Sequence, residues 1–91
     1  MIGSFRHRGL ADLYLENDSR RVNPDLVARC RRRLSVMAEA ESLADLRVPG
    51  YDFHRLHGVP VRYSIHVNGP WTITFEWADG AAWRIDLEQY H

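Results

Sequence analysis

The sequence contains no lysine, a single cysteine and no long apolar run. No stretch approaches the ~18 consecutive apolar residues of a membrane-spanning helix, so no membrane span is expected. Cys30 alone excludes an internal disulfide and a zinc site built from several cysteines. The chain also lacks a glycine-rich nucleotide-binding loop and a G-x-S-x-G nucleophile motif. These absences argue against enzymes that bind nucleotides through a glycine-rich loop and against hydrolases with a G-x-S-x-G nucleophile.

The beginning of the chain does not resemble a secretory signal. Arg6, His7 and Arg8 come early, and no apolar segment of ~7–15 residues follows them. Together with the single cysteine, this pattern predicts a cytoplasmic protein.

The charge is balanced overall but unevenly distributed. Twelve basic and twelve acidic residues give a formal net charge of zero, so overall charge does not attract the chain to nucleic acid or membrane. Residues 1–35 hold eight of the twelve arginines, whereas residues 36–91 hold eight of the twelve acids. A codon bias toward GC-rich codons explains the use of arginine alone. The alternative is a functional preference for bidentate phosphate contacts, which arginine makes better than lysine.

Length and composition predict one domain over residues 1–91, and its helices and strands predict the class α+β. Apolar residues recur at helical spacing in 7–17 and again from Pro24 to about residue 40, where Asn23 is expected to cap the helix. Ser42 is expected to cap a short third turn. Four arginines, Arg29, Arg31, Arg32 and Arg33, lie off the apolar stripe of the second helix.

The second half of the sequence changes to alternation with period two. Segments 61–67, 71–77 and 83–88 read as strands, joined by turns at Asn68-Gly69 and Asp79-Gly80, and residues 51–56 form a plausible extra strand. Two N-terminal helices are expected to pack on the apolar face of this small antiparallel sheet, with Trp71, Trp77 and Trp83 in the core. The other face is expected to stay open to a ligand. It would carry Arg62, Ser64, His66, Thr72, Thr74, Glu76, Arg84 and Asp86.

Several residues are candidates for chemistry, each with a structural alternative. His54 and His57 form H-x-x-H, but on a strand they point to opposite faces, so neither a metal site nor a cofactor is expected. His57 reads as a solvated residue, and His66 is ambiguous. The arginine cluster at 29–33 fits a solvated helix face, a phosphate contact or an acidic protein partner.

The last residues provide the sharpest local feature, because Tyr90-His91 directly follows the last strand. The strand would bring this pair to the edge of the polar face, within reach of His54. Two imidazoles, a phenol and arginines suit RNA cleavage by its own 2′-OH, which needs a proton acceptor, a proton donor and a cation at the phosphate. Imidazole fits either proton role because it titrates near neutral pH.

These residues resemble the HigB-type toxins of bacterial type II toxin–antitoxin modules, in the RelE/ParE superfamily of plasmid maintenance killer proteins. The most specific part is the Ser-Ile-x-Val-Asn-Gly block at residues 64–69, followed by the terminal Tyr90-His91. The resemblance is nearly end to end. It covers residues 2–10, 44–46, 49–51, 53–58, 63–71, 73–75 and 86–91.

The resemblance implies two helices on an antiparallel sheet and a metal-independent endoribonuclease that cleaves mRNA in the ribosomal A site. It assigns catalysis to His54, Tyr90 and His91. By the same resemblance, basic residues would hold mRNA or ribosomal RNA, with Arg29, Arg32, Arg33 and Arg62 as candidates. The implied partner is a HigA-like antitoxin with a helix-turn-helix domain, which neutralises the toxin and binds promoter DNA.

Two departures from the family pattern put nuclease activity in question. Many relatives have Asp where this chain has Gln89, and many have Arg where this chain has Thr72. The zero net charge also argues against nuclease activity on the ribosome, because it is low for a protein that binds the ribosome. The alternative function is a toxin that binds a protein target such as DNA gyrase, as the ParE branch does, and a variant retained only as the antitoxin's partner is a third interpretation.

Overall fold

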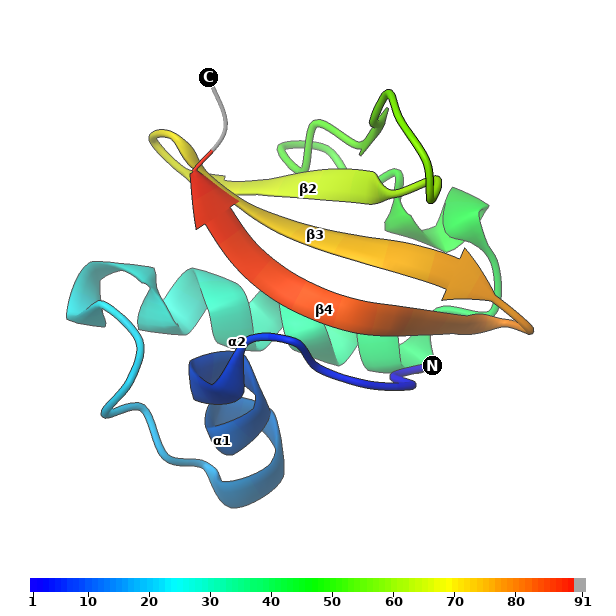
Figure 1. The fold of residues 1–91 in the computed structure, drawn as a ribbon. Coiled ribbons are helices and arrows are strands. Elements are labelled where there is room, and N and C mark those ends of the chain that lie inside the picture. Colours follow the sequence, from blue (N-terminus) through cyan, green and yellow to red (C-terminus); the bar gives the residue numbers. More distant parts are fainter. Residues whose placement is uncertain (90–91) are drawn as a thin grey trace.

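A computed structural model describes residues 1–89, and it has the α+β architecture expected from the sequence (Figure 1). Two helices and a one-turn 3-10 helix precede a four-stranded antiparallel sheet with the order β1-β2-β3-β4. The elements are α1 (Arg8–Glu16), α2 (Pro24–Glu39), η1 (Leu43–Leu46), β1 (His54–Arg55), β2 (Tyr63–Asn68), β3 (Trp71–Ala78) and β4 (Ala81–Gln89).

The helices begin where the sequence predicts, because side chains there satisfy exposed backbone N–H groups. Asn23 accepts a hydrogen bond of 2.9 Å from the N–H of Asp25 at the start of α2. At the start of α1, Nδ1 of His7 accepts one of 3.1 Å from the N–H of Leu10. Ser42 occupies the expected cap position before η1.

The sheet has the predicted alternation, with one correction at its edge. Ile65, Ile73 and Leu87 are neighbours across β2, β3 and β4 and face the core, so the period-two pattern is confirmed there. The strand expected over residues 51–56 is reduced to β1, two residues long. Asp52 has φ of +48°, which interrupts an extended backbone before His54.

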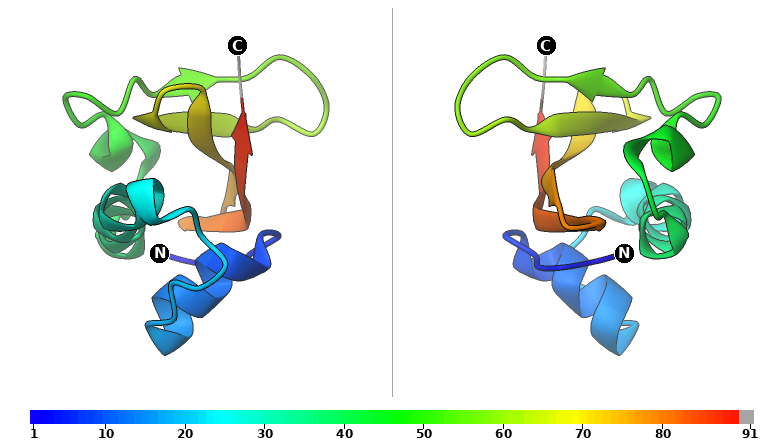
Figure 2. Two further views of the ribbon diagram at one scale, coloured as in Figure 1. Left: turned by 90° about the vertical axis from the view of Figure 1, so that its left-hand side faces the viewer. Right: turned by 90° about the vertical axis from the view of Figure 1, so that its right-hand side faces the viewer.

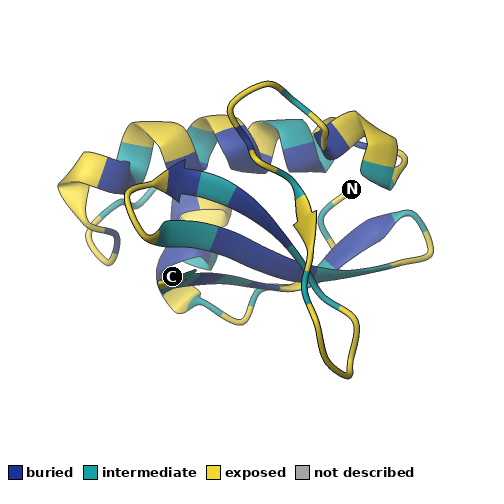
Figure 3. Ribbon diagram, turned by 90° about the horizontal axis from the view of Figure 1, so that it is seen from above, coloured by how far each residue is buried: buried dark blue, intermediate teal, exposed yellow. Residues whose placement is uncertain are grey.

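The core lies between α2 and the sheet. Figure 2 shows both helices on one side of the sheet, away from the loop that joins β1 to β2. The apolar stripe of α2 is buried, as expected, with Leu26, Cys30, Leu34 and Met37 at most 2% exposed. By contrast, β1 and the loop after it are exposed over most of their length (Figure 3). The edge of the sheet at β1 is therefore accessible for a site.

One tryptophan does not occupy its predicted place. Trp71 and Trp77 pack against the core as half-buried residues, but Trp83 pairs with Glu76 and so shares the polar face with it. The cause is a bulge in β4, where Arg84 has φ of +50° and the register with β3 shifts. A bulge adds one residue and reverses the inward and outward phase beyond it. Trp83 instead lies over Gly3 and donates a 2.9 Å hydrogen bond to the Ala78 carbonyl.

Candidate functional site

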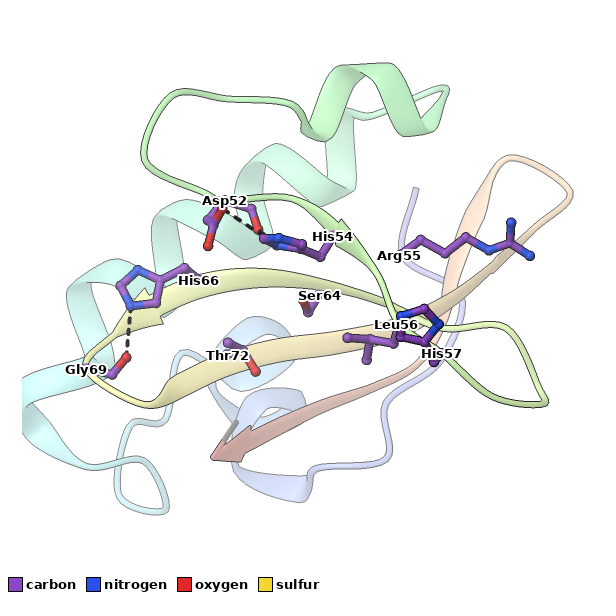
Figure 4. Close-up of a pocket in the computed structure, with 9 residues that line it drawn as sticks. All are labelled: Asp52, His54, Arg55, Leu56, His57, Ser64, His66, Gly69 and Thr72. Carbon is purple, nitrogen blue, oxygen red and sulfur yellow. Dashed lines mark hydrogen bonds and ion pairs between the residues drawn. The ribbon is translucent and has the colours of Figure 1, made fainter. Parts of the chain in front are cut away.

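A hollow of about 510 Å³ lies on the polar side of the sheet, where β1 and its following loop meet β2 and β3 (Figure 4). Ser64 and Thr72 come from the two central strands, and three imidazoles, those of His54, His57 and His66, stand around them. A nucleotide-sized ligand suits a cavity of this volume. The structure therefore gathers proton-transfer groups where the sequence predicts a site.

His54 lies on β1 beside Ser64, with its side chain 61% exposed. Its Nδ1 is 2.7 Å from the carbonyl oxygen of Asp52 and 3.6 Å from the Oδ1 of the same residue. These two contacts fix one side of the ring (Figure 4). The candidate base is thus held by the backbone and flanked by a carboxylate, as catalytic imidazoles commonly are.

The H-x-x-H pair is arranged differently from the sequence expectation. His54 and His57 line the same hollow, because β1 ends at Arg55 and the chain turns before His57. The rule for opposite faces applies only within a strand. The loop is closed by a 2.8 Å hydrogen bond from the N–H of Leu56 to the carbonyl of Arg62.

His66 is the third imidazole, and its role was ambiguous from the sequence. Its Nε2 is 3.0 Å from the carbonyl oxygen of Gly69 in the β2–β3 turn, and its ring lines the hollow. The sequence placed His66 on the polar face and left its role open, but it did not predict that Asp52 lies beside His54. The pairing of His66 with Thr72, next to the Asn68-Gly69 turn, brings His66 to the hollow.

Arg62 belongs to an ionic cluster on the same face. Its Nη1 donates to Glu88 Oε2 at 2.7 Å, and Thr74 donates a short hydrogen bond to the same carboxylate. Burial acts to raise the pKa of Glu88, but these hydrogen bonds and the guanidinium hold it below its usual value. Arg62 is thus positioned by a charged partner.

The polar face is less open than the sequence suggests. Ser64 and Thr74 are buried, the latter completely, although both belong to the face expected to be uncovered. For Thr74 the reason is visible in its contacts, because the Arg62 and Glu88 side chains both lie within hydrogen-bond distance of its hydroxyl. The accessible part of the face is therefore the hollow around Thr72.

The four candidate RNA-binding arginines do not form a single patch. Arg29 and Arg32 are exposed on α2, as a phosphate contact requires. Arg33, expected off the apolar stripe, is only 8% exposed. Its Nε donates to the His66 carbonyl at 2.7 Å, and its guanidinium lies 4.5 Å above the Tyr51 ring. Arg33 therefore faces the end of β2 and not solvent. Burial lowers the pKa of its guanidinium.

The other two predicted catalytic residues, Tyr90 and His91, lie outside the described residues. The last residue that is described, Gln89, pairs with Trp71 at the end of the sheet. Within residues 1–89 no three His, Cys, Asp or Glu side chains come together in a way that could hold a metal ion. In the same range, no helix is long and apolar enough to cross a membrane.

Comparison with known proteins gives one family and two similar proteins. Residues 3–91 match the model of the HigB-like toxins, described as the RelE-like toxin of type II toxin-antitoxin system HigB. The chain is 35% identical over 92 residues to "Endoribonuclease HigB" of Proteus vulgaris, covering both chains completely. It is 29% identical over 89 residues to "Toxin HigB-1" of Vibrio cholerae serotype O1, covering 94% of each chain.

Proposed function

Because the chain belongs to the HigB-like family of RelE-like toxins, we propose that it is a toxin that cleaves mRNA on the ribosome. The name of the Proteus vulgaris relative supports the endoribonuclease activity, and it does not favour the protein-target alternative. The observation that carries the proposal is the hollow lined by His54, His57 and His66. Three imidazoles around one hollow offer groups that can accept and donate protons.

The reaction that fits these groups is transesterification within the RNA. His54 takes the proton of a ribose 2′-OH through Nε2, and the 2′ oxygen attacks the adjacent phosphorus. The bond from phosphorus to the 5′ oxygen breaks, giving a 2′,3′-cyclic phosphate and a 5′-OH end. Tyr90 or His91 protonates the leaving 5′ oxygen, and an arginine stabilises the charge on the phosphorane. Arg62, which pairs with Glu88 on the same face, is an RNA contact in this proposal. No metal and no cofactor takes part.

RNA contacts outside the hollow are assigned to Arg29 and Arg32. Both guanidinium groups are exposed on α2, where they can reach phosphates of mRNA or ribosomal RNA. Arg33 was included among these contacts from the resemblance. Its hydrogen bond to the His66 carbonyl instead supports a role in holding the hollow together.

The partner of the toxin is an antitoxin, as the family implies. We propose that the antitoxin is HigA-like, with a helix-turn-helix domain, and that promoter DNA is bound only through the complex. The toxin would act in the cytoplasm, where the ribosomes are.

The test is translation in vitro with purified protein, followed by mapping of mRNA 5′ ends by primer extension. Cleavage within codons that requires ribosomes, and that is lost in His54→Ala and His91→Ala, is the expected result. Glu16→Ala, an exposed change at the end of α1, serves as the control and should cleave normally. General acid–base catalysis contributes about 10²–10⁴-fold, so the histidine variants should lose at least two orders of magnitude.

Intact mRNA at high toxin concentration would overturn the proposal. In that case inhibition of purified DNA gyrase would support the protein-target alternative. If cleavage were absent, the next variants to assay would be Gln89→Asp and Thr72→Arg, which restore the residues that many relatives carry. Cleavage of naked mRNA at the same sites would refute ribosome dependence while leaving the nuclease assignment in place.

A further inference from the structure

The backbone that leads into His54 is fixed by a turn, by a buried tyrosine and by a hydrogen bond to the carbonyl of that tyrosine. Pro49 and Gly50 form a turn closed by a 3.0 Å hydrogen bond from the Tyr51 N–H to the Val48 carbonyl, and Gly50 has φ of +88°. This is the geometry of a type II turn, in which glycine avoids a steric penalty. Tyr51 is then buried beneath Arg33, and its carbonyl accepts from the N–H of His66.

Asp52 follows with φ of +48°, a left-handed conformation that costs most residues about 1 kcal/mol or more. Aspartate and asparagine tolerate it better than other side chains. The conformation turns the Asp52 carbonyl toward the imidazole of His54, at 2.7 Å from Nδ1. The next residue, Phe53, stacks on Tyr63 with 5.6 Å between ring centroids, which anchors the backbone on the other side.

The contact with a carbonyl determines which imidazole nitrogen carries the proton. A carbonyl oxygen only accepts hydrogen bonds, so Nδ1 of His54 is the donor. In the neutral ring, Nε2 is therefore the unprotonated nitrogen and is available to accept a proton. The Asp52 carboxylate, 3.6 Å from Nδ1, stabilises the imidazolium once that proton has been taken.

We propose that Asp52 is the positioning residue of His54: its left-handed backbone selects the Nδ1–H tautomer, and its carboxylate stabilises the protonated ring. The proposal deepens the proposed function and rests on it, because it assumes that His54 is the base. Asp52 is itself exposed, with a side chain 74% accessible, so packing against the core does not explain the conformation. Its neighbours Tyr51 and Phe53 hold the backbone on either side, and the Asp52 side chain itself contacts His54.

Three variants separate the backbone effect from the carboxylate effect. Asp52→Gly keeps the left-handed conformation and removes the carboxylate, and Asp52→Asn does the same with a side chain of similar size. Asp52→Val disfavours the conformation, because a β-branched residue at positive φ is strongly strained. Asp79, an exposed aspartate with φ of +54° in the β3–β4 turn, provides matched controls as Asp79→Asn and Asp79→Val.

The first measurement is the tautomer of His54, read from imidazole ¹⁵N chemical shifts in the full-length protein with His54→Ala used for assignment. Wild type, Asp52→Asn and Asp52→Gly should carry the proton on Nδ1. Asp52→Val should shift the population toward Nε2–H, and neither Asp79 variant should change it. Observation of Nε2–H as the main form in wild type, or of an unchanged tautomer in Asp52→Val, would overturn the backbone role.

The second measurement is ribosome-dependent cleavage. Asp52→Asn and Asp52→Gly should lower kcat about three- to five-fold with KM unchanged, the size of an exposed ionic contact. Asp52→Val should lower it about ten-fold, since it also loses the hydrogen bond. Wild-type kcat in Asp52→Asn would refute the carboxylate role. If His54→Ala cleaves like wild type, His54 is not the base and the proposal fails with it. If wild type leaves mRNA intact, the proposed function fails instead, and the tautomer measurement still decides the geometry.

Discussion

Replacement of Arg33 by methionine tests whether this arginine supports the hollow or contacts RNA. Arg33 is 8% exposed, and its Nε donates a 2.7 Å hydrogen bond to the carbonyl of His66. Its guanidinium also lies 4.5 Å from the centre of the Tyr51 ring. Its Nη1 donates a longer hydrogen bond, 3.3 Å, to the carbonyl of Arg29. Methionine keeps the apolar stem but removes all three interactions. The change therefore isolates the contribution of the charged group.

The expected cost follows mainly from the two stronger interactions that are lost, the hydrogen bond to His66 and the contact with Tyr51. A hydrogen bond from a charged donor contributes about 1.5–3 kcal/mol, and a partly desolvated cation–π contact contributes about 0.5–2 kcal/mol. Because the contributions overlap, we expect the free energy of unfolding to fall by about 2–4 kcal/mol. For a domain of this size, the lower figure corresponds to a decrease of roughly 8–16 °C in Tm.

The assay is urea unfolding at constant pH, followed by circular dichroism and tryptophan fluorescence. Arg32→Met is the matched control, because Arg32 is the preceding residue of α2 and is exposed. We expect the control to change stability by no more than about 0.5 kcal/mol. Equal stabilities for the Arg33 and Arg32 variants would refute the supporting role and return Arg33 to the candidates for RNA contact.

Three further changes probe other parts of the molecule. A Cβ on Gly3 would lie 2.6 Å from the Trp83 ring, so Gly3→Ala should cost about 1–3 kcal/mol in urea unfolding, and less in a Trp83→Val background. Burial acts to raise the pKa of Glu88, but its hydrogen bonds hold it below the ordinary 4.5, so this stabilisation is present above pH 4.5 and is lost as pH falls through the lower folded pKa. The urea midpoint of wild type should therefore fall more than that of Glu88→Gln on acidification through this range, and equal decreases would contradict the assignment. Burial raises the pKa of Cys30 to about 11, so a thiol reagent should modify the folded protein far more slowly than the unfolded chain at mildly alkaline pH.

The sequence predicts the fold well where local signals and burial agree. The cap at Asn23 and the apolar stripe through Leu26 and Leu34 locate α2, and alternation locates the three long strands. The fold class and the family resemblance are both confirmed. In these elements, each local preference agrees with the tertiary arrangement, which is the condition under which pattern reasoning succeeds.

The predictions that were wrong concern positions where the backbone leaves its regular geometry. The bulge at Arg84 places Trp83 on the polar face, and the left-handed Asp52 ends the predicted edge strand before it can form. Both residues have positive φ without being glycine, so the sequence carries no strong sign of them. The side on which Arg33 packs was missed because a charged residue type was assigned to solvent, although position 33 follows Cys30 by three residues and precedes Met37 by four. Its long side chain reaches a carbonyl and an aromatic ring.

The candidate site depends on these same irregular positions. Regular strands alone would place His57 on the opposite face from His54, and the early end of β1 is what brings both to one hollow. Arg33 then connects the helix layer to two walls of that hollow, because it contacts Tyr51 on one segment and the His66 carbonyl on another. A shift of α2 relative to the sheet would therefore move the backbone before His54 and the backbone of His66 together. The packing of α2 against the sheet and the geometry of the hollow are therefore coupled. A substitution that loosens the packing of α2 should also move the residues that line the hollow.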